Sequence, residues 1–150
     1  MINYGSVYLV VKDFDGALEF YKKLFQKDVA DQNMTRFAIF NIDGLCLAIY
    51  NGLFDTDYPE KVIHKGKYYE QYDNMPKILD KENSGKIVIN LNTDDLRQEY
   101  RRISGLGIGS ELTEIRYINA RMPYYYFSMK DLDGNTIEIT GPYTPTDGEF

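Results

Sequence analysis

Very few side chains in this sequence can bind a transition metal or act as a nucleophile. The 150 residues include one histidine, His64, and one cysteine, Cys46. A two-histidine, one-carboxylate iron site therefore cannot form within one chain. Cys46 has no evident base near it in the sequence, so we interpret it as a small buried thiol. Glu138, between Ile137 and Ile139, is the candidate catalytic residue, in the role of a general base.

The composition indicates a globular chain that is rich in aromatic rings. Hydrophobic residues make up 43% and charged residues 27% of the chain, which contains 14 Tyr, 8 Phe and no Trp. Such rings suit half-buried sheets and cavity walls. We expect one domain, because a chain of this length buries roughly 70% of its unfolded surface.

The charge and the cysteine count disfavour several classes of partner. The formal net charge of −6 argues against nucleic acid, whose phosphates are bound by clustered Lys and Arg. A single cysteine cannot form an intramolecular disulfide, and no apolar run approaches the roughly 18 residues of a membrane span. Residues 1–16 carry no basic leader, so we expect a cytoplasmic protein with no membrane partner.

The spacing of apolar residues predicts a strand, a helix and three further strands in the first part of the chain. The first strand covers residues 6–12, and Asp13 caps a helix with an apolar stripe from Phe14 to Phe25. Asp43-Gly44 is a strong signal for a hairpin between the last two strands. The three later strands are predicted over 28–34, 35–41 and 45–50.

The same order of elements returns after residue 85. Ile87, Ile89 and Leu91 form the inward face of a strand over 86–92. Thr93 is predicted to cap the next helix and Gly105 to end it. Extended segments are predicted over 110–118, 122–130 and 135–140, with Asp133-Gly134 between the last two.

The two halves can be aligned by their glycines. Gly5 matches Gly85 at an offset of 80, whereas Gly44 matches Gly134 at an offset of 90. The sequence therefore predicts an internal duplication with ten extra residues in the second half. Residues 53–84, between the halves, show no periodicity and are expected to form a lid, a partner-binding arm or a linker. The tail over 142–150 is expected to be irregular.

Two stretches resemble the glyoxalase, bleomycin-resistance and extradiol-dioxygenase superfamily, also called vicinal oxygen chelate proteins. They are VYLVVKDFDGALEFYKKLF, with Val-x-Asp before a helix containing Phe-Tyr, and FSMKDLDGNTIEI, with Asp-x-Asp-Gly-x-x-Ile-Glu. The resemblance implies an α+β fold of two tandem βαβββ modules, over about 5–52 and 85–141. Their curved mixed sheets would enclose a ligand cleft, with the helices on the convex side, and the protein would form a homodimer.

The resemblance also implies positions for metal ligands, one on the first and one on the last strand of each module. Carried over to this sequence, these positions fall on Ser6, Ala48, Lys86 and Glu138. Of these, only Glu138 is a good ligand, because a protonated lysine has no free lone pair. We therefore expect neither a metal nor another cofactor. We expect Lys86 and Glu138 to form an ion pair in place of the metal; alternatively, both are ordinary strand residues with solvent-facing tips.

Strand alternation assigns further side chains to the concave face of the cleft. Ala38 and Cys46 are expected there, among others. The predicted ligand-binding residues are Tyr8, Arg36, Tyr50, Lys86, Asn90, Tyr124, Tyr126, Ser128 and Glu138.

Three functions fit these features. The first is metal-independent binding of the bleomycin-resistance type, in which a small organic molecule is sequestered in the cleft. The second is a diverged glyoxalase-like lyase or a dioxygenase-like enzyme, with Glu138 as the base or as a remaining metal ligand. The third is an interaction domain in which residues 53–84 recognise a partner. The acidic chain suits a cationic ligand, whereas Arg36 and Lys86 suit an anion, so both ligand charges stay open.

Overall fold

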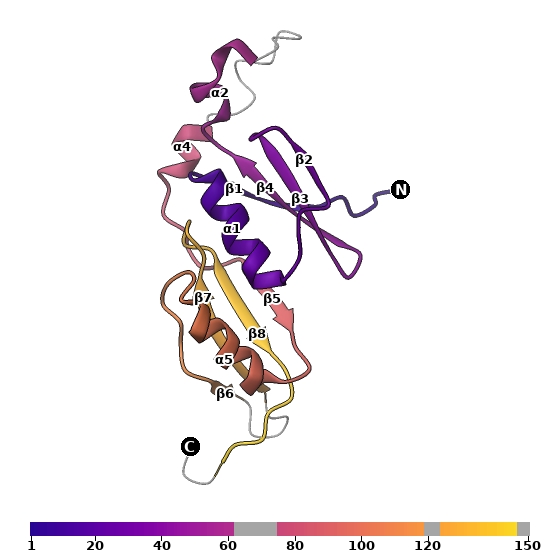
Figure 1. The fold of residues 1–150 in the computed structure, drawn as a ribbon, viewed down its shortest axis with the longest axis vertical. Helices are drawn as coiled ribbons and strands as arrows, with labels where there is room; N and C mark the ends of the chain where they lie inside the picture. Colours follow the sequence, from indigo (N-terminus) through magenta and orange to yellow (C-terminus); the bar gives the residue numbers. More distant parts are fainter. Residues whose placement is uncertain (62–74, 119–123, 147–150) are drawn as a thin grey trace. The chain divides into compact units, whose positions relative to one another are not determined.

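The computed structural model describes residues 1–61, 75–118 and 124–146 of the chain. The chain divides into two compact units, Met1–Glu82 (unit 1) and Asn83–Phe150 (unit 2). Each unit contains one strand, one longer helix and three further strands in the same order (Figure 1). The predicted α+β fold with two βαβββ modules is therefore confirmed.

Unit 1 forms a four-stranded mixed sheet with one helix on one of its faces (Figure 1). The strand order is β1-β4-β3-β2, with β1 parallel to β4 and the other pairs antiparallel. The elements are β1 (Val7–Val11), α1 (Phe14–Phe25), β2 (Asp31–Asn33), β3 (Phe37–Ile42) and β4 (Leu45–Asn51).

Helix α1 begins where the sequence predicts it. The side chain of Asp13 accepts a hydrogen bond from the backbone N–H of Gly16 at 2.9 Å, which satisfies one unpaired donor of the first turn. The rings of Tyr21 and Phe25 lie 6.3 and 5.5 Å from that of Phe40 on β3, so the apolar stripe of the helix packs on the sheet. On the outer side, the Lys23 ammonium, 2.8 Å from Glu19, lowers the pKa of that carboxyl group.

The hairpin between β3 and β4 has the tight turn expected from Asp43-Gly44. Both residues have positive φ angles, 50° and 81°, as a type I′ turn requires. Asn41 accepts a hydrogen bond from the backbone N–H of Gly44 at 3.0 Å. This turn fixes the register of β4, which pairs with both β1 and β3.

The segment after β4 contains short helical turns that periodicity does not predict. They are α2 (Phe54–Asp57), η1 (Pro59–Lys61) and α4 (Met75–Leu79), and α4 contacts β1 within unit 1. His64, Tyr68, Tyr69 and Tyr72 lie outside the described residues.

Unit 2 repeats the connectivity of unit 1. Its strand order is β5-β8-β7-β6, with β5 parallel to β8 and the other pairs antiparallel. Leu96 and Ile103 of its helix are buried, and the Tyr100 ring lies 5.2 Å from that of Phe127 on the sheet. The elements are β5 (Val88–Asn92), α5 (Leu96–Leu106), β6 (Arg116–Ile118), β7 (Tyr124–Lys130) and β8 (Thr136–Thr140).

The predicted ends of the second helix are wrong by about two residues. The N-cap is Asp95, whose side chain accepts from the backbone N–H of Gln98 at 2.9 Å, whereas Thr93 accepts only from Asp95. The helix continues past Gly105 and ends at Gly107, which has the left-handed φ of 60°. Glycine favours this conformation because it has no Cβ, and Gly105 does not adopt it.

The second hairpin is longer than the first. A loop over 131–135 joins β7 to β8, and the buried carboxylate of Asp131 organises it. Asp131 accepts from the backbone N–H groups of Asp133 and Asn135 at 2.9 and 2.8 Å, and from the Asn135 side chain at 2.7 Å. The long strand predicted over 110–118 is reduced to β6 and an isolated bridge between Ser110 and Lys130.

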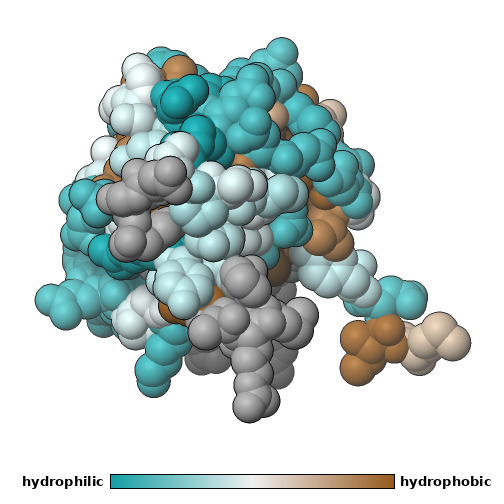
Figure 2. Space-filling model, turned by 90° about the horizontal axis from the view of Figure 1, so that it is seen from below, coloured by the Kyte–Doolittle hydropathy of each residue, from teal (hydrophilic) through white to brown (hydrophobic). Residues whose placement is uncertain are grey.

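The described residues include no helix that is both long and apolar enough to cross a membrane. Hydrophilic residues predominate on the face shown in Figure 2, where hydrophobic residues are scattered among them. Scattered exposed apolar residues of this kind are normal on a folded surface.

Candidate functional site

The carboxylate of Glu138 lies at the centre of the sheet face of unit 2 opposite α5. Its neighbours in register are Asn90 on β5 and Ser128 on β7. Its Oε1 atom accepts hydrogen bonds from Asn90 Nδ2 at 2.8 Å and from Tyr124 Oη at 2.7 Å. Asn90 Nδ2 also lies 3.1 Å from Tyr124 Oη, which closes a triangle of polar groups. The triangle fixes the orientation of the carboxylate.

The second oxygen of Glu138 has capacity left for a ligand. Within 1–61, 75–118 and 124–146, the hydrogen bonds of this carboxylate all go to Oε1, and the residue is half-buried. A carboxylate can accept about four hydrogen bonds through its two oxygens. Oε2 is therefore placed to accept an N–H or O–H donor from a bound molecule.

The predicted ion pair between Lys86 and Glu138 is wrong. Lys86 lies before β5, and its recorded hydrogen bond is from its backbone N–H to Ser84 at 3.4 Å. Asn90, four residues later, is the residue opposite Glu138, and four residues of a strand span roughly 13 Å. Tyr8, beside Ala48, corresponds to Asn90, beside Glu138, at an offset of 82, so the offset of 80 taken from Gly5 and Gly85 is two residues short for this strand.

The corrected register of β5 also places Ile87 outside the core of unit 2. Ile87 precedes β5 and is 76% exposed, whereas Ile89 and Leu91 are half-buried and have the predicted parity.

Most of the remaining residues on this face of unit 2, here called the polar face, are aromatic or hydrogen-bonding. The rings of Tyr124 and Tyr126 lie 5.9 Å apart and are tilted by 39°. Lys130 donates a hydrogen bond to the Thr136 hydroxyl at 2.6 Å. These two residues pair across β7 and β8, two residues along from the Ser128–Glu138 pair. We define the polar face by Asn90, Arg116, Tyr124, Tyr126, Ser128, Lys130, Thr136 and Glu138.

Two charged residues near this site are absent from the sequence prediction. Lys130 has the same strand parity as Ser128, so extending the alternation by one step finds it. Arg116 on β6 pairs with Tyr126 and shares its face, but β6 is too short for alternation to reveal this. The polar face thus carries both signs of charge.

The corresponding face of unit 1, opposite α1, is mainly aromatic and apolar; we call it the aromatic face. The Tyr50 ring lies 6.1 Å from that of Tyr8 and 6.2 Å from that of Phe37. Ala48 pairs with Tyr8 and with Ile39, and it occupies the place that Glu138 has in unit 2. Tyr8 and Tyr50 therefore share a face as predicted.

Arg36 and Ala38 do not belong to the aromatic face. Strand β3 starts at Phe37, and Ala38 is fully buried opposite Ile49, on the side that packs against α1. The register of the Asp43-Gly44 hairpin sets this parity. Arg36 instead forms an ion pair with Asp55, in which Nη2 and Oδ1 lie 2.7 Å apart. Its guanidinium lies 4.4 Å from the centre of the Phe54 ring.

The donor set of the two faces does not suit a metal centre of the vicinal oxygen chelate type. The residues aligned with Asn90 and Glu138 in unit 1 are Tyr8 and Ala48, so the faces supply one carboxylate. The residues that the structure describes include no group of three or more His, Cys, Asp or Glu side chains able to hold a metal ion. Cys46 is half-exposed on β4, and it adds one thiol at most.

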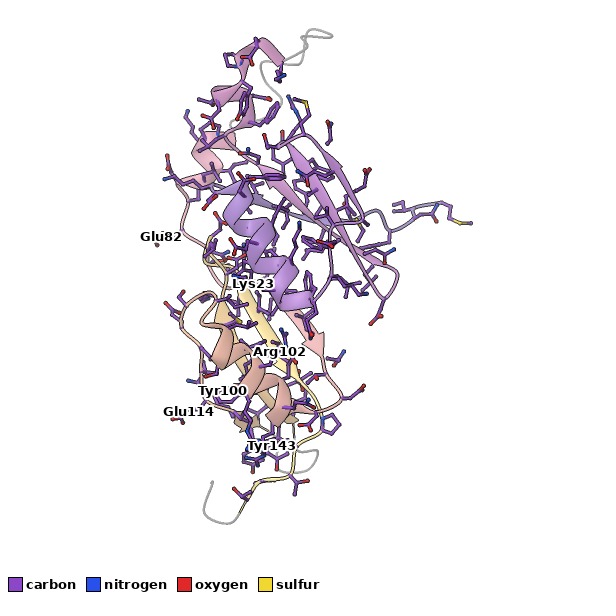
Figure 3. The ribbon with its side chains drawn as sticks, in the orientation of Figure 1. Lys23, Glu82, Tyr100, Arg102, Glu114 and Tyr143 are labelled. Atoms are coloured by element: carbon purple, nitrogen blue, oxygen red, sulfur yellow. The ribbon has the colours of Figure 1, made fainter. Side chains whose placement is uncertain are left out.

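A groove of about 420 Å³ lies on the helix side of unit 2, away from the polar face. It is lined by Arg97, Tyr100, Arg101, Glu114 and Ile115. The Arg97 guanidinium is 4.6 Å from the centre of the Tyr143 ring and donates to the Thr144 carbonyl at 3.0 Å. Figure 3 labels Tyr100, Glu114 and Tyr143 in this part of the unit. These contacts anchor the C-terminal segment on α5.

Comparison with known proteins assigns this chain to one superfamily. The sequence model of the glyoxalase/bleomycin resistance protein/dioxygenase superfamily matches residues 3–139. The chain belongs to this superfamily. No curated protein matches the sequence.

Solved structures share the fold at low sequence identity. A lactoylglutathione lyase from Agrobacterium tumefaciens is 14% identical, with a TM-score of 0.62 over 93% of this chain and 92% of that one. A glyoxalase/bleomycin resistance protein from Catenulispora acidiphila is 17% identical, with a TM-score of 0.57 over 93% and 97%. A family enzyme from Burkholderia phytofirmans is 13% identical, with a TM-score of 0.62 over 91% and 95%. Identities this low carry the fold and not the activity.

Proposed function

We propose that this protein binds a small organic molecule without the help of a metal, in the manner of the bleomycin-resistance branch of its superfamily. The observation that carries the proposal is the Glu138 carboxylate, held by Asn90 and Tyr124 through Oε1, which leaves the capacity of Oε2 for a ligand. Aromatic surfaces with a few oriented polar groups are the usual composition of small-molecule sites.

The chemistry of the faces suggests which part of a ligand each would contact. Glu138 Oε2 takes an N–H donor, such as an ammonium or a guanidinium group, because an ionised carboxylate only accepts hydrogen bonds. The rings of Tyr124 and Tyr126 offer flat surfaces for an apolar or aromatic part. Arg36 pairs with Asp55, Lys86 precedes β5 and Lys130 donates to Thr136. The hydrogen bonds to Glu138 come from the neutral groups of Asn90 and Tyr124, so we propose a ligand that brings an amine to this carboxylate.

A thermal-shift screen tests this proposal. We expect at least one compound in a panel of aromatic amines, guanidinium compounds and bleomycin to raise the melting temperature, since a ligand at 100 times its Kd adds about 2.7 kcal/mol. Glu138→Gln should weaken that binding at least tenfold, because it replaces the accepting oxygen with an amide that donates. Glu114→Gln, the same change in the helix-side groove, should bind like the wild type. If the wild type, Glu138→Gln and Glu114→Gln bind the compound equally well, Glu138 does not contact the ligand.

A second candidate is an enzyme in which Glu138 is the general base. The same fixed carboxylate supports it, because an acid–base residue must be held within hydrogen-bond reach of the proton that it moves. The two candidates differ in product: a binding protein returns its ligand unchanged. Mass spectrometry of each bound compound after incubation distinguishes them, and a new mass that is absent with Glu138→Gln would favour the enzyme.

The proposed oligomer is a homodimer, as the superfamily resemblance implies. Sedimentation at two protein concentrations would measure the mass of the oligomer. The proposed ligand contact with Glu138 does not depend on the oligomeric state.

A further inference from the structure

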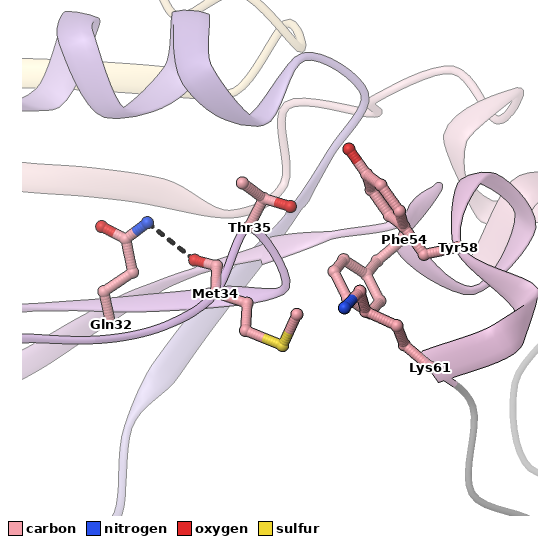
Figure 4. A pocket seen from close by; sticks show the side chains of 6 residues that line it. All are labelled: Gln32, Met34, Thr35, Phe54, Tyr58 and Lys61. Carbon is pink, nitrogen blue, oxygen red and sulfur yellow. Dashed lines mark hydrogen bonds between the residues drawn. The ribbon is translucent and has the colours of Figure 1, made fainter.

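Unit 1 contains a cavity of about 510 Å³ that the Glu138 site does not include. It lies between the turn that joins β2 to β3 and the short helices α2 and η1 (Figure 4). Its volume is within the range of about 300–1,000 Å³ that is typical of small-molecule pockets. The lining residues are Gln32, Met34, Thr35, Phe54, Tyr58 and Lys61.

One wall of the cavity is fixed by hydrogen bonds to backbone carbonyls. Gln32 Nε2 donates to the Met34 carbonyl at 2.7 Å, as drawn in Figure 4. Asn51, which is buried, donates from Nδ2 to the Thr35 carbonyl at 2.8 Å and accepts from the Leu53 N–H at 3.0 Å. Asn51 thus connects the turn to the start of α2, so the two walls hold their spacing without a ligand.

The opposite wall is aromatic. Phe54 is 2% exposed, and its ring lies 5.0 Å from that of Tyr58. The Arg36 guanidinium, 2.7 Å from Asp55, lies 4.4 Å from the centre of the Phe54 ring. Phe54 therefore has neighbours that hold its orientation, while Tyr58 and the half-exposed Met34 extend the apolar surface into the cavity.

Lys61 is the one charged side chain among the described residues that line the cavity. Lys61 is exposed, and its side chain is one of those that line the cavity (Figure 4). A lysine ammonium donates three hydrogen bonds and accepts none, whereas the hydroxyls of Thr35 and Tyr58 can do both. A ligand that pairs with Lys61 must therefore supply an acceptor next to the apolar surface.

We propose that this cavity is a second ligand site, specific for a small aromatic carboxylate. The ring of the ligand lies against Tyr58 and Met34, and its carboxylate pairs with the Lys61 ammonium. This site has the opposite charge preference from Glu138, which takes a donor, and it shares no residue with the polar face.

Benzoate is the probe for this proposal, and benzyl alcohol is its uncharged counterpart. In a titration followed by amide NMR of the full chain, benzoate should give saturable shifts at Gln32, Met34, Thr35, Tyr58 and Lys61. Benzyl alcohol should bind at least fivefold more weakly, because it cannot pair with the ammonium.

Two substitutions test whether the carboxylate of benzoate lies next to Lys61. Lys61→Met should weaken benzoate binding at least fivefold and leave benzyl alcohol unchanged, whereas the matched control Lys27→Met should change neither. Met34→Glu, on the facing wall, should also weaken benzoate by like-charge repulsion; both positions are exposed, so we expect the variants to fold. The proposal is overturned if benzoate shifts only residues outside this cavity, shifts none, or binds Lys61→Met as well as the wild type.

Discussion

Replacing Phe127 with alanine is expected to lower the free energy of unfolding by about 4 kcal/mol, within the usual cost of removing a buried phenylalanine ring. Phe127 on β7 is fully buried, pairs with Ile139 on β8 and packs edge-on against Tyr100 of α5. Removing its ring leaves a cavity between the helix and the sheet. Urea denaturation followed by circular dichroism measures the change.

The comparison for this variant is Leu132→Ala. Leu132 is 54% exposed in the loop after β7, so its loss should change the free energy of unfolding by less than about 0.5 kcal/mol. If Phe127→Ala costs no more than Leu132→Ala, the packing of α5 on the sheet is not as described.

Asp131→Ala is expected to cost about 3 kcal/mol. The carboxylate is 4% exposed and accepts three hydrogen bonds from Asp133 and Asn135, and alanine leaves these donors without their acceptor. Because this loop sets the register of β7 and β8, its loss should also disturb Glu138 and Ser128, which pair across them. Unfolding by urea and the amide NMR spectrum of β8 report the two effects.

Asp131→Asn separates the hydrogen bonds from the charge. Asparagine keeps the oxygen that accepts from the two backbone N–H groups, but it points an amide at the Asn135 side chain. We expect about half the loss seen with alanine. A full loss would mean that the negative charge, rather than the geometry of the loop, stabilises this turn.

The sequence predicts much of the fold because its local signals and its repeat agree. Asp13 caps α1, the apolar stripe of α1 meets Phe40, and Asp43-Gly44 forms the tight turn that its residue types favour. Each of these features depends on residues close together in the chain. The helix ends in unit 2 were missed because Thr93 and Gly105 resemble caps as much as Asp95 and Gly107 do.

The site was predicted less well because cross-strand neighbours depend on register. Alternation along one strand placed Tyr124, Tyr126, Ser128 and Glu138 on one face, as the structure has them. The partner of Glu138 comes from β5, more than 40 residues earlier. The offset of 80 carried the first-strand position from Ser6 to Lys86, whereas the residues beside Ala48 and Glu138 are Tyr8 and Asn90, at an offset of 82. A glycine outside the strands cannot fix such an offset, since the lengths of turns vary between repeats.

The corrected register changes the character of the site. A Lys86–Glu138 pair would have satisfied the carboxylate internally and left little capacity for a ligand. Asn90 and Tyr124 are neutral donors that orient Glu138 without cancelling its charge. This is why we propose a ligand that brings its own N–H donor to Glu138.

Metal independence is the central claim, and one calorimetric titration tests it most directly. The compound that most stabilises the wild type would be titrated into protein treated with excess EDTA, and again into the same protein after dialysis and addition of one equivalent of zinc, nickel, iron or manganese. We expect the same Kd within twofold in every titration, because one carboxylate, an amide and a phenol form the centre of the site. Binding that disappears with EDTA and returns with one equivalent of a metal would contradict it.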